Sequence, residues 1–425
     1  MLPVTLLREE RDHALVGLEK RNFPNAAATI DRIVALDDRR KSLQTQNDEL
    51  LAEKNSLSKD IGQLFKSGKK DEANEKRDRV NLIKDESASI ETALEEVVAE
   101  LENELLQLPN IPHKLVPAGK SAEDNEVYKA YEGELPRLSD DAKPHWELAE
   151  DYGIFSLELG VRITGSGFPV FTGQGARLQR ALVNYFLDRN TAAGYTEYAP
   201  PLLVNEDSAR GTGQLPDKEG QMYHVTGDDL YLIPTAEVPL TNLYRGELLE
   251  PAALPIKLTG YTPCFRREAG SYGSHVRGLN RVHQFDKVEI VEMTLPNESY
   301  TRLDAMVNHV GGLLDELGLP YRILRLCGGD MGFTSAMTFD FEVWSAAQER
   351  WLEVSSVSNF ETFQSNRLKL RYRTEKGTEL LHTLNGSALA LPRIIAALLE
   401  NNQGAEGILL PEVLHGYFGA DQLVR

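Results

Sequence analysis

The chain has 425 residues, and 65 acidic residues against 46 Lys and Arg give it a net charge of −19. Surfaces that bind phosphate usually carry excess Lys and Arg, so this balance disfavours a general nucleic-acid binder. The presence of only two cysteines excludes a disulfide framework and a Cys-rich zinc module, and is typical of a cytoplasmic protein. The apolar runs are far shorter than the roughly 20 residues of a membrane span, and the N-terminus does not have the pattern of a secretory signal.

The first part of the chain predicts a long helical arm. Residues 26–108 contain no Pro, and Leu recurs every seven positions over 36–64. Apolar residues then return at alternating spacings of three and four over 80–101. Each pattern places an apolar seam on a helix of roughly 35–40 residues. We therefore predict an antiparallel two-helix coiled coil with its tip near residues 66–72 and the polar Arg40, Asn47 and Lys54 on its seam.

Helices and strands mix from about residue 145 onward. A helix is expected over 175–193, with Leu178, Leu182 and Phe186 on one face, and a strand over 195–199. Later strands are expected over 287–292, 338–343, 350–355 and 367–373. Because these strands come in runs with short connections, we predict an α+β fold with an antiparallel sheet and flanking helices. The expected division is 1–113 for the arm and 114–425 for the rest.

Four arginines gather around one predicted hairpin. Arg266 and Arg267 precede a Gly-rich segment, and Arg277 and Arg281 follow it. Arginine offers fixed bidentate geometry to phosphate oxygens, so the pattern favours a polyphosphate ligand, with Phe285 placed to stack on a flat base. An ordinary charged surface hairpin is the alternative interpretation.

A second segment, residues 382–403, predicts a buried helix that begins near Pro392. Pro suits the first helical turn because its missing N–H would be unpaired there anyway. Arg393 then stands at the helix N-terminus, where backbone N–H groups already favour an anion. A plain buried helix is the alternative interpretation.

These two segments resemble motifs 2 and 3 of the class II aminoacyl-tRNA synthetases, and the helix over 175–193 with Pro200 resembles motif 1. Further matching segments are 212–216, 232–238, 325–332 and 353–359. With the arm, their order resembles the seryl-tRNA synthetases of the bacterial type over essentially the whole chain. The resemblance implies a cytoplasmic, ATP-dependent serine–tRNA ligase that forms seryl-adenylate and transfers serine to tRNA(Ser), and also to tRNA(Sec). It further implies a homodimer formed through motif 1.

The resemblance also assigns residues to the reaction. The expected catalytic residues are Arg266, which would hold the α-phosphate and the serine carboxylate, and Arg393, which with Arg277 would clamp the outer phosphates. The expected ATP-binding set is Arg266, Arg267, Glu268, Arg277, Val282, Phe285, Glu353, Val354, Ser355, Ser356 and Arg393. The expected L-serine set is Thr235, Ala236, Glu237, Arg266, Glu289, Asn385 and Ser387. A pocket that hydrogen-bonds the serine hydroxyl rejects alanine, which lacks it.

Glu353 and Ser356 are the expected Mg²⁺ ligands, and no zinc is expected. Because they lie three residues apart, they face opposite sides of a straight strand. Both reach one ion only if the strand ends or bulges near Ser355.

In this family the arm holds the long variable arm of the tRNA. Between residues 66 and 84, seven basic residues stand among four acidic ones, whereas residues 85–104 hold eight acidic residues and no basic one. The expected tRNA-binding residues are Lys69, Lys70, Arg77 and Arg79; a solvated helix face is the alternative. The basic residues of the 367–373 strand would share one face and either meet the tRNA acceptor end or form a plain charged face. Positive charge is thus local, which reconciles the net charge with a nucleic-acid partner.

Two other functions compete. One is a ligase that charges a carrier protein with an amino acid; it would lack the arm and would use a zinc site. The archaeal form of the synthetase would also use a zinc site. A catalytically inactive tRNA-binding paralogue is expected to have lost Arg266, Glu268, Glu353 or Arg393, and all four are present.

Overall fold

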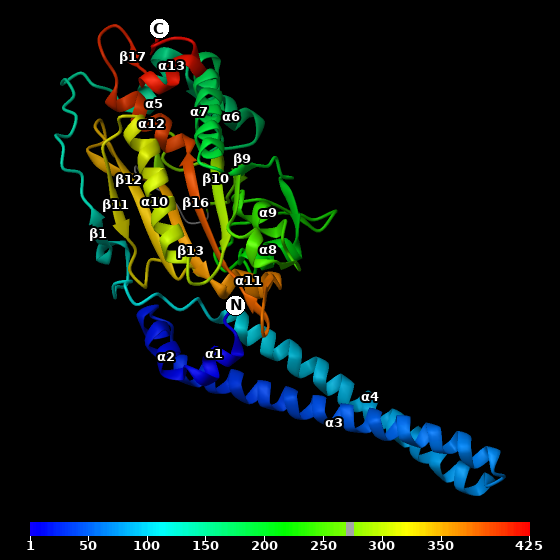
Figure 1. Cartoon of the computed structure of the whole chain (residues 1–425). Helices are drawn as coiled ribbons and strands as arrows, with labels where there is room; N and C mark the ends of the chain where they lie inside the picture. Colours follow the sequence, from blue (N-terminus) through cyan, green and yellow to red (C-terminus); the bar gives the residue numbers. More distant parts are fainter. Residues whose placement is uncertain (269–275) are drawn as a thin grey trace. The chain divides into compact units, whose positions relative to one another are not determined.

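The structure, a computed structural model, describes residues 1–268 and 276–425, which form two compact units (Figure 1). The smaller unit comprises residues 2–19 and 23–109; the larger comprises residues 20–22 and 110–425 together with Met1. The helices of the smaller unit are α1 (Val4–Glu9), α2 (Arg11–Lys20), α3 (Ala26–Lys66) and α4 (Lys70–Gln107). Within the described residues, no helix combines the length and the apolar character needed to cross a membrane.

Helices α3 and α4 form the predicted antiparallel arm (Figure 1). Gly68 adopts a φ of +79° in the turn between them, a left-handed conformation that favours glycine. The buried side chains recur on the predicted seam, among them Ile33, Leu36, Ile83 and Val97. The predicted coiled coil is therefore confirmed.

Asn47 lies on this seam opposite Ser87. The Ser87 hydroxyl donates to Asn47 Oδ1 at 2.7 Å, and both residues are buried. A shift of one helix along the other would leave two buried polar groups without partners, so the pair stabilises one register.

The larger unit is built on a sheet that has eight strands in the described part of the chain. From edge to edge they are β1 (Glu126–Lys129), β11 (Tyr321–Arg325), β12 (Met337–Ser345), β13 (Arg350–Glu361), β16 (His382–Ala390), β10 (Gln284–Thr294), β9 (Ile256–Phe265) and β4 (Thr196–Glu197). All neighbouring strands are antiparallel except β4 and β9. The predicted α+β class with an antiparallel sheet is confirmed, although the strand expected over 195–199 is reduced to β4.

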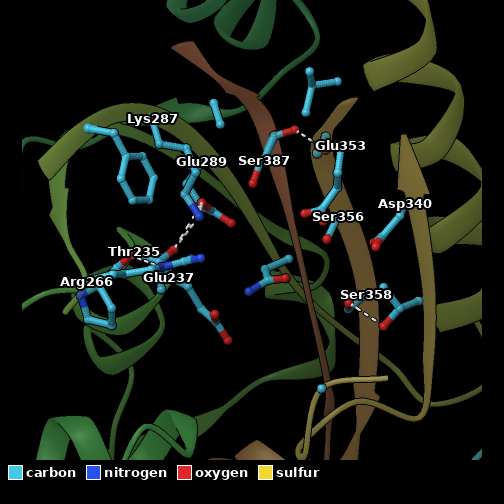
Figure 2. Close-up of a pocket in the computed structure, with 18 of the residues that line it drawn as sticks. Thr235, Glu237, Arg266, Lys287, Glu289, Asp340, Glu353, Ser356, Ser358 and Ser387 are labelled. Carbon is cyan, nitrogen blue, oxygen red and sulfur yellow. Dashed lines mark hydrogen bonds and ion pairs between the residues drawn. The ribbon is translucent and has the colours of Figure 1, made fainter. Parts of the chain in front are cut away.

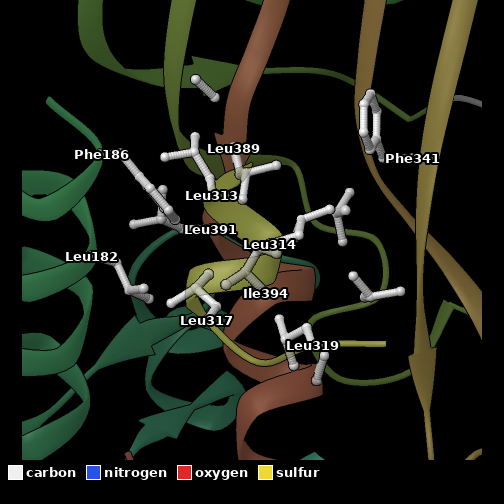
Figure 3. Close-up of a cluster of buried hydrophobic side chains, with 14 of the residues drawn as sticks. Leu182, Phe186, Leu313, Leu314, Leu317, Leu319, Phe341, Leu389, Leu391 and Ile394 are labelled. Atoms are coloured by element: carbon white, nitrogen blue, oxygen red, sulfur yellow. The ribbon is translucent and has the colours of Figure 1, made fainter. Parts of the chain in front are cut away.

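Three helices cover one face of this sheet: α7 (Gly173–Ala192), α10 (Ser299–Glu316) and α12 (Leu391–Asn401) (Figure 1). Figure 3 shows their apolar side chains packed together, with Leu182 and Phe186 from α7, Leu313 and Leu314 from α10, and Ile394 from α12. Strand residues that alternate toward these helices, such as Phe341, complete the core. The polar residues between them therefore point to the other face.

Smaller elements complete the larger unit. Its other described helices are α5 (His145–Tyr152), α6 (Leu157–Ile163), α8 (Glu206–Thr212), α9 (Glu237–Asn242), α11 (Thr362–Leu368) and α13 (Glu412–Phe418), with 3-10 turns at Ala122–Asp124 and Pro251–Ala253. The remaining strands form small sheets: β2 (Phe155–Ser156) with β3 (Val170–Phe171), β5 (Leu203–Asn205) with β7 (Leu230–Leu232) and β6 (Tyr223–Val225), β8 (Leu248–Leu249) with β14 (Arg371–Thr374) and β15 (Gly377–Leu380), and β17 (Ile408–Leu409) with β18 (Gln422–Leu423).

The predicted strand over 367–373 is wrong. Arg367 lies in helix α11, and Lys369 follows it with a φ of +55°. Only Arg371 and Arg373 share a strand face, in β14. Phe363 and Leu368 are buried on α11, and this apolar burial outweighs the two-residue spacing of the basic residues that suggested a strand.

Candidate active site

The polar face of the sheet lines a cavity of about 730 Å³ in the larger unit. Its walls come from strands β10, β12, β13 and β16, from the segment after β9, and from the start of α9. Figure 2 shows two groups of side chains in it: Thr235, Lys287 and Glu289 at one end, and Asp340, Glu353 and Ser356 at the other.

Lys287, Glu289 and Thr235 form a buried triangle of hydrogen bonds (Figure 2). The Lys287 ammonium lies 2.7 Å from Glu289 Oε2 and donates to Thr235 Oγ1 at 2.9 Å. The Thr235 hydroxyl in turn donates to Glu289 Oε2 at 3.1 Å. Burial raises the pKa of Glu289 above its ordinary value, and the Lys287 charge opposes that rise. The other carboxylate oxygen of Glu289 takes part in no hydrogen bond among the described residues and is available to a ligand.

Glu237 begins helix α9 and is the second buried acid of the cavity. Gln364 Nε2 donates to its Oε1 at 2.6 Å, and the Thr383 hydroxyl holds Gln364 by donating to Gln364 Oε1 at 2.7 Å. Burial, together with the Glu289 charge, raises the pKa of Glu237 to about 7. This end of the cavity therefore favours a ligand that carries a positive charge and a hydroxyl group.

Arg266 follows strand β9 and lies on the Thr235 and Glu237 side of the cavity (Figure 2). Its Nε donates to Pro234 O at 3.2 Å, and its guanidinium carbon lies 5.3 Å from the centroid of the Phe285 ring. The Glu268 N–H donates to Gln221 Oε1 at 3.0 Å, which fixes the main chain of the same segment, and the Glu268 carboxylate is paired with Arg281. A cation, an acid and a flat ring thus stand together at the wall of the cavity.

Strand β13 carries the bulge that the predicted metal pair requires. Ser356 pairs with Asp340 and Glu353 pairs with Glu342, while the register shifts between these two pairs so that Val354 is left over. Asp340 and Glu342 are two residues apart on β12 and share one face, so Glu353 and Ser356 share it too. Asp340 Oδ1 is buried without a hydrogen-bond partner among the described residues.

Arg393 lies where the sequence predicts, in the first turn of α12. Its Nε donates to Asn280 O at 2.8 Å and its Nη1 donates to Glu353 O at 2.7 Å. The side chain therefore joins the α12 helix to strand β13 and to the segment that returns from the Arg-rich hairpin. The guanidinium keeps further N–H groups for an anion.

Most of the predicted site residues meet in this cavity. The predicted residues that line it are Thr235, Glu237, Arg266, Glu268, Val282, Phe285, Glu289, Glu353, Val354, Ser355, Ser356, Asn385, Ser387 and Arg393. Three do not line it. Ala236 is packed in an apolar cluster, Arg267 donates its N–H to Gln221 O, and the Arg277 guanidinium carbon lies 4.8 Å from the Trp146 ring centroid. The Gly-rich part of the predicted hairpin, residues 269–275, lies outside the described residues.

Sequence reasoning missed several charged residues of the cavity, among them Lys287 and Asp340. Both carry a signal in strand alternation, because Lys287 is two residues before Glu289 and Asp340 stands between the core residues Phe339 and Phe341. Each is a charged residue on the side of the strand opposite to its apolar neighbours.

Comparison with known proteins matches two parts of the chain to known families. Residues 1–112 match the family "Seryl-tRNA synthetase N-terminal domain", and residues 223–402 match the family "tRNA synthetase class II core domain (G, H, P, S and T)". A serine–tRNA ligase of Salinibacter ruber is 53% identical over 393 residues, which is 92% of either chain. The structure of the seryl-tRNA synthetase of Pyrococcus horikoshii complexed with ATP superposes with a TM-score of 0.90 at 32% identity, over 100% of this chain and 99% of that one. The cytoplasmic serine–tRNA ligase of Naegleria fowleri in complex with AMP gives a TM-score of 0.86 at 26% identity, with 100% and 99% coverage.

Proposed function

Because the chain belongs to the seryl-tRNA synthetases, the class II enzymes that ligate serine to tRNA with ATP, we propose that its cavity is where L-serine and ATP form seryl-adenylate. One observation carries the assignment: a buried acid–hydroxyl cluster and three arginines, Arg266, Arg281 and Arg393, line one cavity. A serine carboxylate oxygen attacks the α-phosphorus of ATP and pyrophosphate leaves. The 3′-terminal hydroxyl of the tRNA then attacks the serine carbonyl carbon and AMP leaves.

Serine occupies the end formed by Thr235, Glu237 and Glu289, with Asn385 and Ser387 beside it. The free oxygen of Glu289 accepts the serine hydroxyl, and Glu237 faces the serine ammonium group, which stabilises the ionised acid. Alanine leaves a buried acceptor unpaired in this pocket, which opposes its binding. Lys287 holds Glu289 in place through the 2.7 Å ion pair.

ATP occupies the other end. Arg266 faces the α-phosphate and the serine carboxylate, where negative charge gathers during the attack. Phe285 and Val282 flank the adenine ring, Glu268 accepts from its amino group, and Arg393 faces the outer phosphates. The attacking carboxylate is already ionised, so catalysis rests on orientation and charge stabilisation and needs no general base.

The donor set at Glu353 and Ser356 fits Mg²⁺. It offers only hard oxygen atoms, and the buried, unpaired Asp340 Oδ1 lies beside it. The described residues contain no group of three or more His, Cys, Asp or Glu side chains placed to hold a metal. When bound, Mg²⁺ neutralises charge on the phosphates.

The helical arm contacts tRNA(Ser), and the family resemblance extends the proposal to tRNA(Sec). Lys70 and Arg77 are exposed near the arm tip and form no ion pair among the described residues. Lys69 pairs with Glu72, and Arg79 pairs with Glu53 and Glu86. Of the four predicted residues, Lys70 and Arg77 are therefore the most available for tRNA phosphates.

The functional form is a cytoplasmic homodimer. Helix α6, which precedes the motif 1 helix α7, exposes Leu159, Val161 and Ile163 by 38%, 55% and 75%. A group of exposed apolar side chains on one short helix is typical of a surface that another protein chain covers in the assembled protein. The Ile163→Asp variant is expected to elute as a monomer in size-exclusion chromatography with light scattering.

Amino-acid-dependent ATP–pyrophosphate exchange, run with each amino acid in turn, tests the proposal. We expect exchange with serine and none with alanine. Serylation of transcribed tRNA(Ser) and tRNA(Sec) then tests the partners. A folded enzyme that binds tRNA but gives no exchange would instead be an inactive paralogue, and transfer of an amino acid to a carrier protein would identify the other competing class.

A further inference from the structure

Resting on the proposed function, we propose that His145 is a positioning residue for ATP, which acts with Glu400 to fix residues 277–282 at the nucleotide end of the cavity. Leu279, Asn280 and Val282 of this segment line the cavity, whereas His145 does not. The segment returns from the Arg-rich hairpin and contains no helix or strand beyond a single turn, so other elements must hold it.

His145 is the first residue of helix α5 and is fully buried. The Leu279 N–H donates to His145 Nε2 at 2.8 Å, so this nitrogen is the acceptor. The proton is then on Nδ1, which donates to Glu400 Oε1 at 2.6 Å. Both ring nitrogens are used, one for the main chain of the segment and one for an acid that fixes the ring.

Glu400 is the centre of this network and is also fully buried. Its Oε1 accepts from the His145 N–H at 3.0 Å and from Gln348 Nε2 at 2.9 Å, and its Oε2 accepts from the Ser345 hydroxyl. A buried carboxylate is stable only when it is so surrounded by donors. The arrangement leaves the imidazole one orientation, because rotating the ring would break the bonds at both nitrogens.

Gln348 extends the network to a second point of the segment. Asn280 Nδ2 donates to Gln348 Oε1 at 2.9 Å, while Asn280 O accepts from Arg393 Nε at 2.8 Å. Arg393 and Glu400 both belong to helix α12. The helix that presents an arginine to the phosphates therefore also holds, through Glu400 and His145, the segment opposite it.

Two further contacts show how closely α5 and the segment fit. Gly278 has a φ of +68°, and a Cβ there would come within 2.2 Å of His145 Nε2. Next to His145, Trp146 has the Arg277 guanidinium carbon 4.8 Å from its ring centroid. The first two residues of α5 thus support consecutive parts of the segment.

The test is pyrophosphate exchange with ATP and serine varied separately in the full-length enzyme. Removal of a hydrogen bond to the main chain in His145→Phe is expected to raise the KM for ATP about tenfold, with the KM for serine within about twofold of wild type. His145→Gln, whose amide oxygen can accept from the Leu279 N–H, is expected to restore part of the ATP affinity. Gln348→Leu, a change at a partly exposed residue, is expected to raise the KM for ATP less than His145→Phe does.

His309→Phe is the matched control. The His309 ring bonds to Asn190 Oδ1 at 2.7 Å in the same unit and lies outside the cavity. It is expected to lower stability without changing the KM for ATP. Equal changes in both KM values, or the same ATP effect in the control, would overturn the positioning role. Absence of serine-dependent exchange in wild type would instead overturn the proposed function.

If His145→Phe does not fold, Gln348→Leu and His145→Gln decide the matter. An unchanged KM for ATP in both, in enzymes with wild-type Tm, contradicts the proposal. A selective rise in either supports it.

Discussion

The Lys287 ammonium lies 2.7 Å from Glu289 Oε2, and both side chains are buried on the same face of strand β10. Either charge alone in this position would be costly, because burial removes its water without supplying a partner. The pair therefore lets an ionised acid stand at the end of the cavity that we assign to serine.

We expect Lys287→Met to weaken serine binding more than ATP binding. Removing one partner of a buried ion pair costs about 3 kcal/mol and leaves Glu289 to protonate or shift, so the KM for serine should rise more than tenfold. Steady-state exchange kinetics and urea unfolding measure both effects. Lys257→Met is the control, because Lys257 lies outside the cavity and donates to Ala193 O. A larger change in the ATP constant than in the serine constant would contradict the assignment.

Glu237 should make stability depend on pH. Its pKa is raised from 4.5 to about 7, chiefly by burial, so the folded chain binds this proton more tightly than the unfolded chain. The associated stability is fully present below about pH 4.5 and is lost as the pH rises through about 7, a difference of about 3 kcal/mol. We expect the stability of Glu237→Gln not to fall in this way as the pH rises.

Urea unfolding followed by tryptophan fluorescence at several pH values measures this difference. All three tryptophans, Trp146, Trp344 and Trp351, belong to the larger unit and report on it. Stability curves of wild type and Glu237→Gln that run parallel between pH 4.5 and 7.5 would contradict the raised pKa.

The arm residues should affect tRNA charging alone. Replacing Lys69, Lys70, Arg77 and Arg79 by Ala is expected to reduce serylation. It should also reduce the dependence of serylation on salt, because each contact to a phosphate releases cations bound to the tRNA. Serine-dependent pyrophosphate exchange should persist. We expect Lys70→Ala with Arg77→Ala to account for most of the loss, whereas Arg79→Ala also removes the ion pairs with Glu53 and Glu86.

Arg32→Ala is the control for the arm, since Arg32 pairs with Glu100 and Glu104 far along the helices from the tip. It should leave serylation near wild type. If exchange falls as much as serylation in the tip variants, the arm has a different role.

Arg277 should report ATP binding through Trp146. Because the family resemblance assigns Arg277 to the outer phosphates, we expect its guanidinium, whose carbon lies 4.8 Å from the Trp146 ring centroid, to leave that ring when ATP binds. In a Trp344→Phe, Trp351→Phe background, ATP is expected to change the Trp146 emission, and Arg277→Ala should abolish that change. An equal change in the Arg277→Ala variant would show that the signal has another source.

Local periodicity predicted the arm and most of the sheet because both rest on repeating apolar positions. It failed for residues 367–373, where the spacing of basic residues suggested a strand while Phe363 and Leu368 pack as a helix. The cavity was predicted largely through resemblance, and strand alternation alone would have pointed to Lys287 and Asp340. His145 and Glu400 could not be paired from the sequence, because 255 residues separate them and only the folded chain joins them.

The bulge at Val354 divides strand β13 into two halves that are out of phase with each other. On one side of it odd-numbered residues face the cavity, and on the other side even-numbered residues do, so Glu353 and Ser356 can act together. In an unbroken strand that kept Val354, one of these two side chains would point into the core. Deleting Val354 would instead leave Glu353 and Ser356 two positions apart and still on one face, so the extra residue changes the local bend and twist of β13 between them.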